Sequence, residues 1–525
     1  MSSIDKSHDM ETAIPTKSNS SNAKGSIEVQ IDGETYFIDA AAERRLVWKF
    51  DLHILPVLSV MYLFNALDKA NLGNAKTNGL EKDLGMLGTN QYSTILSIFF
   101  VPYVLTAPFL AVLGKKYGPS RVLPAMMFTF GSMTVLVVAV QNFSGLFALR
   151  WFLGMAESKR FSKARSKNLG SGLTGPCATG AFFPLVIYYQ TQFYRRGELG
   201  RRLAIFYAAS NIAYALGGLL AFGTFQIKGG SIANWRYLFA LEGSLTICMA
   251  IIAFLLLPYS AAHAKFLTED EKKLAFYRMQ VDSSTVVNEP FVFRDAIAIL
   301  KEPTSWVILG IEICLGVPLQ SVGLFLPQIV ARLGYDTIKT NLYTVAPNIS
   351  GAVMLLILGF ASDYTRWRFP FVALGFFFTF MGFVIYAAID VEHSLQVAYF
   401  ACFMMTWGTS APSVLLDVLY NNNIAHEGRR VLLTSIGIPL ANLMGLVSSN
   451  IFRNQDAPDY IPALATTAAF GAAGIVLTLG LGAFMIFDNK RRDRKQGLGV
   501  RMRGPDVSTA LMRDGPKSPD FRWYY

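Results

Sequence analysis

The feature that most constrains the fold is a series of long apolar stretches that recurs along almost the whole chain. About twelve of them approach ~20 residues, the length that an α-helix needs to cross the hydrocarbon core of a bilayer. Only 16% of the 525 residues are charged, whereas a soluble domain carries about 25%. The pattern therefore predicts an all-α polytopic membrane protein.

The expected spans fall into two groups of six, separated by a polar segment at residues 258–303. In chain order we expect them at residues 50–67, 92–113, 122–140, from about 146 onwards, 203–225, 237–257, 306–330, 342–361, 371–389, 395–419, 431–452 and 461–487. Six spans, a loop and six more spans are typical of secondary transporters built from two matched halves. We predict twelve transmembrane helices, with one six-helix bundle at 46–257 and a second at 304–487.

The basic residues lie mainly in alternate loops, and this predicts the orientation of the chain. One set of loops holds 17 Lys and Arg residues and the other holds 8. The richer set faces the cytoplasm by the positive-inside rule, which makes 258–303 a cytoplasmic loop and 1–45 and 488–525 cytoplasmic tails. We expect the first tail to be disordered because it is polar and has no apolar core. The same clustering explains the net charge of +11 without a nucleic-acid partner.

The fourth expected span is interrupted by a charged segment. Residues 149–157 and 180–189 look like two half-spans, but residues 158–179 between them carry five Lys and Arg residues. Each such charge costs about 2.5–3.5 kcal/mol at the centre of an inserted helix. We therefore predict that 158–179 is a non-native insertion derived from an unspliced in-frame intron. The alternative is a genuine loop that leaves the span.

Motifs of common enzymes and of ATP-driven pumps do not occur in the sequence. It has no Gly-x-x-x-x-Gly-Lys-Ser/Thr loop for nucleotide phosphates, no His-Glu-x-x-His and no Gly-x-Ser-x-Gly. None of the four cysteines forms a Cys-x-x-Cys pair, and Cys and His residues do not cluster. We expect no enzymatic activity, no cofactor and no metal.

A candidate gate follows the eighth expected span. Residues 359–368 contain Gly359, Asp363, Arg366 and Arg368 and resemble the Gly-x-x-x-Asp-x-x-x-x-Arg loop of the major facilitator superfamily. An Asp at a helix end can pair with cationic groups or a helix N-terminus of the other half and so hold one face closed. The corresponding loop at 114–121 keeps the Gly and basic residues but lacks the Asp. The alternative is two ordinary basic turns.

Further motifs extend the resemblance to one branch of that superfamily. They lie at residues 67–75 (Leu-Asp-Lys-Ala-Asn-Leu-Gly-Asn-Ala), 150–157 (Arg-x-x-x-Gly-x-x-Glu), 234–243, 266–271 and 450–460. Taken in order, they make the chain similar to the fungal anion:cation symporters, the allantoate and nicotinate permease group, although that group has Arg where this chain has Lys69.

The resemblance implies the major facilitator fold and proton-coupled symport of a small organic anion such as nicotinate or allantoate. It also implies a multi-pass protein of the plasma membrane, and we expect a monomer. The alternatives are an exporter of a fungal secondary metabolite and, because the fourth span is interrupted, an inactive or sensor-like product.

Charged residues inside apolar spans are the first candidates for the transport site, because burying a charge in a membrane is costly. Asp68 and Lys69 end the first expected span and form either a water-facing interfacial pair or part of a vestibule. Arg150 and Glu157 lie two helical turns apart on one face of the fourth span. Arg150 would attract an anion and Glu157 would take up a coupling proton; alternatively, Arg150 makes a structural pair with a neighbouring helix.

Two more buried acids and a set of aromatic and amide residues complete the candidates. Glu242 in the sixth span and Glu312 in the seventh are further coupling residues or members of structural pairs. Aromatic and amide side chains that either line a cavity or bond between helices are Tyr207, Asn211, Tyr214, Gln320, Asn348, Trp407 and Asn442.

Overall fold

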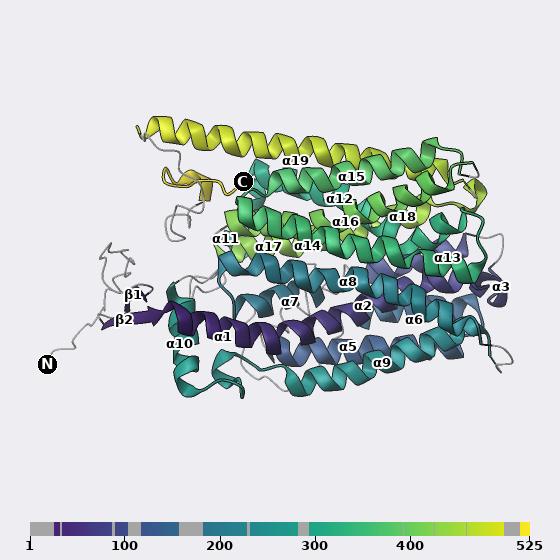
Figure 1. The fold of residues 1–525 in the computed structure, drawn as a ribbon, viewed down its shortest axis with the longest axis horizontal. Helices are drawn as coiled ribbons and strands as arrows, with labels where there is room; N and C mark the ends of the chain where they lie inside the picture. Colours follow the sequence, from purple (N-terminus) through teal and green to yellow (C-terminus); the bar gives the residue numbers. More distant parts are fainter. Residues whose placement is uncertain are drawn as a thin grey trace.

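The computed structural model describes residues 26–31, 34–86, 90–102, 117–156, 182–227, 232–281, 293–391, 393–424, 426–457, 459–497 and 515–525. Within them the chain is almost entirely helical, and the long helices lie side by side in one bundle (Figure 1). The helices of the first half are α1 (Ala40–His53), α2 (Leu55–Thr77), α3 (Leu80–Asp83), α5 (Pro119–Leu136), α6 (Phe143–Ala156), α7 (Phe182–Thr191), α8 (Arg196–Thr224) and α9 (Asn234–Leu256). Residues 91–102 are also helical.

The second half follows two short helices, α10 (Glu269–Val281) and α11 (Phe293–Ile297). Its helices are α12 (Pro303–Ala331), α13 (Thr337–Tyr343), α14 (Val345–Thr365), α15 (Phe369–Ala388), α16 (Leu395–Asn423), α17 (Glu427–Leu443), α18 (Gly445–Ile451) and α19 (Ile461–Lys495). Single turns of 3-10 helix lie at Val137–Ala139, Ala261–His263, Ala298–Lys301, Asn454–Asp456 and Gly515–Lys517.

Nine helical stretches in the described part are long and apolar enough to cross a membrane. They are Ala40–Thr77, Pro119–Ala139, Glu198–Thr224, Asn234–Leu256, Pro303–Ala331, Lys339–Thr365, Phe369–Ala388, Gly428–Ile451 and Ile461–Lys495. α16 has sufficient length, at 29 residues, but its many polar side chains lower its hydropathy. The second and fourth expected spans lie partly outside the described residues, and the predicted insertion at 158–179 lies wholly outside them.

The first span is longer than its apolar composition predicts. α1 and α2 meet at Ile54, Pro56 occupies the first turn of α2, and α2 continues to Thr77. Asp68 and Lys69 therefore lie inside a helix and not at its end, and the Asp68 side chain is buried. The apolar run stops early in the sequence because buried polar residues such as Asn65 and Asn71 face other helices instead of lipid.

Close helix contacts join the two halves of the chain. α8 packs against α14 and α16, and α2 packs against α12. A Cβ atom placed on Gly73 of α2 would lie 2.8 Å from the carbonyl oxygen of Leu324 on α12. At Gly218 of α8, a Cβ atom would lie 2.7 Å from the carbonyl oxygen of Asn341 on α13. Small residues thus allow the helices of the two halves to approach closely.

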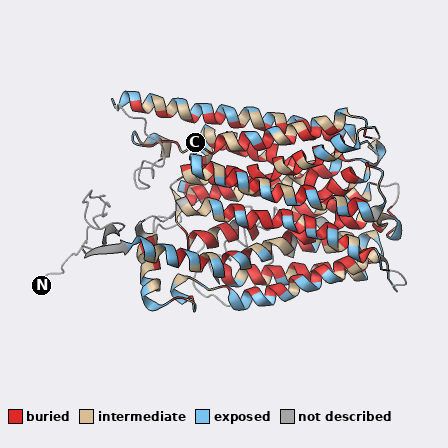
Figure 2. Ribbon diagram, viewed as in Figure 1, coloured by how far each residue is buried: buried red, intermediate tan, exposed pale blue. Residues whose placement is uncertain are grey.

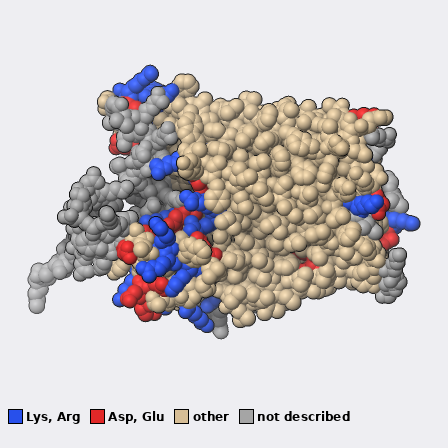
Figure 3. All heavy atoms as spheres, viewed as in Figure 1, with Lys and Arg blue, Asp and Glu red and all other residues tan. Residues whose placement is uncertain are grey.

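The outer surface of the helices is apolar and the ends of the bundle are charged. Buried residues face the interior of the bundle (Figure 2), while large apolar side chains such as Leu255, Val476 and Phe487 are exposed on its outside. Figure 3 shows a broad surface almost without charged residues between two charged ends. A lipid-facing belt has this distribution, because charged side chains are costly in the hydrocarbon region.

One end of the bundle carries most of the basic side chains that Figure 3 shows, and we call it the basic end. It holds α1, α10, the start of α8 and residues 515–525. Arg278 of α10 is completely buried and donates to Glu43 of α1 at 2.7 Å and to Glu198 of α8. Part of the segment 258–303 is therefore helical, and its helix α10 is fixed to the first half of the chain.

Both tails contain more structure than their polar composition predicts. Strands β1 (Ser26–Ile31) and β2 (Glu34–Asp39) pair antiparallel, with Ser26 opposite Asp39, and α1 already begins at Ala40. The last helix, α19, continues to Lys495, and residues 515–525 pack against the bundle. Regular structure therefore extends beyond the tail boundaries predicted at 45 and 487, because composition does not reveal that these polar segments have partners.

Candidate transport site

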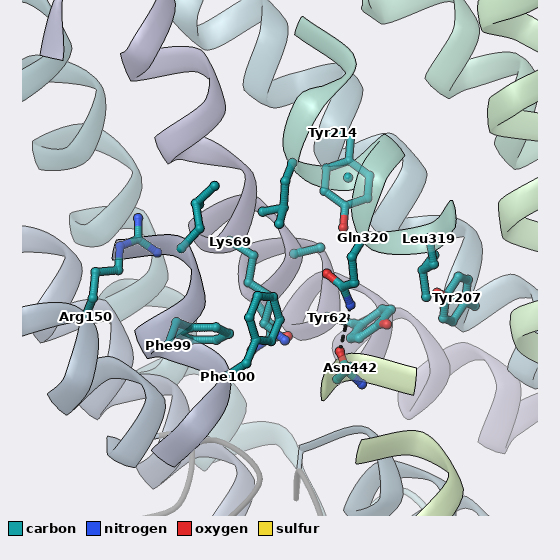
Figure 4. A pocket seen from close by; sticks show the side chains of 15 residues that line it. Tyr62, Lys69, Phe99, Phe100, Arg150, Tyr207, Tyr214, Leu319, Gln320 and Asn442 are labelled. Atoms are coloured by element: carbon teal, nitrogen blue, oxygen red, sulfur yellow. Dashed lines mark hydrogen bonds between the residues drawn. The ribbon is translucent and has the colours of Figure 1, made fainter. Parts of the chain in front are cut away.

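A cavity lies between the two halves of the chain, at the contact of α2 with α12 (Figure 4). Its volume is about 70 Å³. The described residues that line it are Tyr62, Asn65, Ala66 and Lys69 of α2, Leu96, Phe99 and Phe100, Arg150 of α6, Tyr207 and Tyr214 of α8, Leu319, Gln320, Gly323 and Leu324 of α12, and Asn442 of α17. The cavity thus combines basic, aromatic and amide side chains from both halves.

Helical spacing brings these side chains to one surface. Tyr62, Asn65 and Lys69 of α2 follow one another at intervals of three and four residues, which places them on one helix face. Tyr207 and Tyr214 of α8 are seven residues apart and share a face in the same way. The fold needs only to turn these faces toward a common space.

Two cationic groups are the only charged side chains among the described lining residues. They are Lys69, whose ammonium lies 5.9 Å from the centre of the Phe99 ring, and Arg150, which is buried. In Figure 4, Arg150 enters the cavity from one side and the Gln320–Asn442 pair from the other. Positive charge at a site of low dielectric favours an anionic ligand, because little water is present to screen the interaction.

Aromatic rings and amides form much of the remaining wall, together with small and aliphatic residues. Tyr62 stacks on Phe206 with ring centres 4.4 Å apart and lies 5.6 Å from the ring of Tyr207. The Gln320 side-chain amide donates to the Asn442 carbonyl oxygen at 3.1 Å, which links α12 to α17. Flat apolar walls with a few polar groups are common in sites that bind small organic molecules.

Six of the residues that line the cavity are predicted from the sequence, and others are not. The six are Lys69, Arg150, Tyr207, Tyr214, Gln320 and Asn442. Tyr62 and Asn65 were missed, although their helical spacing from Lys69 was a usable signal. Phe99 and Phe100 carried no such signal, because an aromatic residue in an apolar span usually faces lipid or the core.

Three other predicted residues do not line the cavity: Asn211 and Trp407 bond to another helix, and Asn348 bonds to the N-terminal cap of its own helix. Asn211 of α8 donates to the Ser410 hydroxyl on α16 at 2.8 Å, which is a contact between the halves. The Trp407 indole donates to Ser350 at 2.9 Å, and the Asn348 amide donates to the Thr344 carbonyl at 2.9 Å. Glu157 lies outside the described residues.

The buried acids form two pairs near, but not in, the cavity. In the first half, Thr246 of α9 donates to Asp68 of α2 at 3.4 Å, and Asp68 acts electrostatically on the fully buried Glu242. In the second half, Glu312 of α12 and Asp417 of α16 are both buried, and Asp417 acts electrostatically on Glu312. Sequence analysis missed Asp417, although an acidic residue inside an apolar span was the signal used for Glu242 and Glu312.

The Tyr420 hydroxyl of α16 donates to Asp417, which gives the second acid pair a hydrogen-bond partner. A pair of carboxyl groups buried together is costly when both are charged, and a bound proton lowers that cost. Each half of the chain therefore contains a pair of buried acids, and a proton can be held on either member of the pair.

The predicted gate residues lie at the basic end. Asp363, near the end of α14, forms ion pairs with Arg368 of its own loop and with Arg201 of α8, the latter at 3.5 Å. A Cβ atom on Gly200 would lie 3.1 Å from an Asp363 oxygen. Arg366 ends α14 in a left-handed backbone conformation, with φ of 56°, and its side chain is exposed. The acid thus bridges the two halves, whereas Arg366 does not enter the bridge.

No cluster of three or more His, Cys, Asp or Glu residues suited to a metal ion occurs in the described part of the chain. The groups that the cavity offers are therefore hydrogen-bond donors, acceptors, cations and aromatic faces. They can bind and release a solute, and none of them forms a nucleophile–base constellation.

Comparisons with known proteins agree with this arrangement. The sequence profile of the Major Facilitator Superfamily matches residues 58–161 and 169–446. An uncharacterized transporter of Schizosaccharomyces pombe is 49% identical over 94% of this chain and 92% of its own length. The high-affinity nicotinic acid transporter of Saccharomyces cerevisiae is 26% identical over 92% of this chain and 85% of its own length.

A solved structure, the xylose transporter XylE from E. coli, shares the fold with a TM-score of 0.58. It is 12% identical in sequence, and the match covers 83% of this chain and 98% of the other. The profile covers more than half of the chain, and the relatives and the structure are transporters. The chain therefore belongs to the major facilitator superfamily, and it is a multi-pass, helical membrane transporter and not an enzyme.

Proposed function

We propose that this transporter is a symporter that carries a small organic anion together with protons. The observation that supports it most is the cavity between the halves, where Lys69 and Arg150 are the charged members of the described lining. A guanidinium group can hold a carboxylate through two parallel hydrogen bonds, and an ammonium group adds charge from a second helix. A cation would be repelled by this pair, and a neutral sugar would gain hydrogen bonds but no attraction between opposite charges.

The substrate class that fits is a small carboxylate with a flat or nitrogen-containing body. The rings of Tyr62 and Phe99 offer faces for stacking, and the Gln320 and Asn442 amides offer donors and acceptors. The name of the nicotinic acid transporter of Saccharomyces cerevisiae is consistent with this class. A cavity of about 70 Å³ must widen to hold such a molecule, which the alternating movement of two halves would provide.

The coupling step of the proposal uses the acid pairs. Glu242 and Asp68 lie on α9 and α2, and Lys69 follows Asp68 directly in the chain. A proton on this pair removes negative charge next to the anion site and so favours binding of the anion. Release of the proton on the other side of the membrane would then favour release of the anion, which links the two movements.

The remaining parts of the proposal concern the movement of the two halves, the orientation in the membrane and the oligomeric state. The bundles at 46–257 and 304–487 would rock about their contact, and the Asp363–Arg201 pair would close the basic end. This end would face the cytoplasm, because basic loops are retained there. We place the transporter in the plasma membrane as a monomer, in keeping with uptake of a solute by one cavity per chain.

Uptake assays test the coupling and the substrate class together. Cells that express the transporter should accumulate labelled nicotinate, allantoate or pantothenate more strongly at acidic than at neutral external pH. Glu242→Gln should abolish accumulation against a gradient but retain exchange of the anion, since the cavity itself is unchanged. Glu269→Gln, at an exposed position on α10, is the matched control. If none of the three anions accumulates at either pH, the proposal fails.

The interrupted fourth span supports a second candidate, an inactive product. The match to the family profile leaves out residues 162–168, which lie inside the predicted insertion at 158–179. The same uptake assay with a variant that lacks residues 158–179 distinguishes an active symporter from an inactive product. Activity only in the shortened variant would indicate that the full chain is inactive, and sequencing of the spliced transcript would show whether the segment is native.

A further inference from the structure

The residues 521–525 (Phe-Arg-Trp-Tyr-Tyr) pack closely against the basic end of the second half. We call them the docked segment. Its residues Phe521, Arg522 and Trp523 are 0%, 1% and 4% exposed, which is unusual for a segment that follows a polar stretch of sequence. The chain end labelled C in Figure 1 lies against the ends of the helices of this half.

Two asparagines bind the backbone of the docked segment. The Asn489 side chain on α19 accepts from the Trp523 amide at 2.8 Å and donates to the Trp523 carbonyl at 2.9 Å. The Asn423 side chain on α16 does the same with Tyr524, at 2.7 and 2.8 Å. Both asparagines are buried. Each amide thus replaces the partner that an adjacent β-strand would supply, as in the recognition of extended peptides.

Side chains of the segment add specificity to this backbone recognition. The Arg522 guanidinium donates to Asp493 of α19 at 2.8 Å and also to Gln496, the residue that follows α19. The Trp523 indole donates to Asp488 at 2.8 Å. The buried Arg522–Asp493 pair and the Trp523 indole discriminate between peptides, because an unpaired Asp493 would be costly.

The docked segment also contacts the loop that carries the gate. The Arg368 guanidinium lies 5.7 Å from the centre of the Tyr524 ring, and the Tyr525 ring meets Trp367 edge to face at 5.3 Å. Arg368 pairs with Asp363, and Asp363 pairs with Arg201 of the first half. The segment therefore touches the residue that orients the acid of the bridge between the halves.

We propose that α16, α19 and the α14–α15 loop form a peptide-binding site whose ligand is the docked segment, and that its occupancy holds the gate at the basic end closed. Without the segment, Arg368 loses its aromatic neighbour, Asp363 loses its fixed orientation, and the α8–α14 contact opens more often. This device is separate from the anion site, and its test requires no transported substrate.

The rate at which a buried cysteine is labelled measures the opening. Ala204 of α8 is 1% exposed, and its Cβ would lie 3.2 Å from a Cβ placed on Gly359 of α14. An Ala204→Cys variant, with the four native cysteines replaced by Ser, reports the separation of these helices when it reacts with a maleimide in lipid nanodiscs. The starting protein should react slowly.

Two variants and a control carry the test. Deletion of 515–525, and separately the double change Asn423→Ala with Asn489→Ala, should each raise the labelling rate at least fivefold. Asn422→Ala, on the same helix and without a hydrogen bond to the docked segment, should leave the rate unchanged. A synthetic peptide of residues 515–525 should restore slow labelling of the shortened protein but not of the double variant.

Equal labelling rates in the starting protein and the double variant, with both folded by thermal melting, would overturn the proposal. So would fast labelling of the shortened protein that the peptide does not slow, because the site would then not bind its ligand. If the shortened protein does not fold, the double variant decides, since it retains the whole chain. Loss of anion uptake alone would bear on the proposed function and not on this device.

Discussion

Arg150 shows how one residue acquires a role from its surroundings. In the sequence it is a cation in an apolar span, which fits equally with a structural ion pair and with a substrate site. In the structure it is buried and borders the same cavity as Lys69, although the two residues come from α6 and α2. Lys69 carries a positive charge but not the planar fork of a guanidinium, so Arg150 is the residue suited to two-point binding of a carboxylate.

We expect Arg150→Gln to raise the KM for the transported anion about tenfold or more, which corresponds to about 1.4 kcal/mol of binding free energy. The reason is the loss of one of the two positive charges that the described cavity lining presents. The KM is measured from initial rates of labelled nicotinate uptake over a range of concentrations. Arg332→Gln is the control. It removes a guanidinium that follows the last residue of α12 and pairs with Asp459, and it should leave KM unchanged. Equal effects of the two changes would remove Arg150 from the site.

At the scale of elements, the contact of α8 with the second half depends on backbone proximity. Gly218 meets Asn341 and Thr344 of the α13 region at a distance where a Cβ does not fit. Asn211, two helical turns earlier on α8, bonds to Ser410 of α16. α8 therefore serves two purposes: its tyrosines border the cavity, while its glycine and asparagine hold the halves together.

Gly218→Ala should lower the thermal stability by about 1–3 kcal/mol, the usual cost of forcing a methyl group into a packed contact. Gly223→Ala on the same helix has no atom within 4 Å of the added Cβ and is the matched control. Thermal melting of the two purified variants in detergent gives the midpoint of each. The expected order is a lower midpoint for Gly218→Ala and little change for Gly223→Ala, and the reverse order would contradict the close contact.

At the scale of the whole molecule, the distribution of charge predicts the orientation in the membrane. The uncharged belt in Figure 3 separates the basic end, which holds α10, from the end that holds α13. Basic segments are retained in the cytoplasm during insertion. The gate pair of Asp363 and Arg201 and the docked segment would then both be on the cytoplasmic side.

Single cysteines at the two ends test this orientation. In a cysteine-free background, Asp336→Cys should react with a membrane-impermeant maleimide in intact cells. Lys273→Cys on α10 should react only after the membrane is opened or in inside-out vesicles. Both positions are exposed, so differences in labelling report sidedness and not burial. Labelling of both positions in intact cells, or of Lys273→Cys alone, would reverse or refute the predicted topology.

The apolar spans, the class of the protein and part of its site could be predicted from the sequence. Span length and the cost of a buried charge are local properties, so the sequence marks helices and flags Lys69, Arg150, Glu242 and Glu312. The same reasoning placed Asp68 at the end of a helix that in fact continues to Thr77. It failed there because a polar residue that faces another helix looks the same in the sequence as one that faces water.

What the sequence by itself determined is the set of apolar helices, the family motifs and the charged residues that a membrane makes costly. Only the tertiary structure decided which polar residues meet. Tyr207, Asn211 and Tyr214 share spacing on α8, yet the tyrosines border the cavity and Asn211 bonds to α16. The docking of residues 521–525 onto Asn423 and Asn489 was equally invisible. The physical reason is that helical periodicity fixes a face, whereas the partner of that face depends on elements that lie far away in the chain.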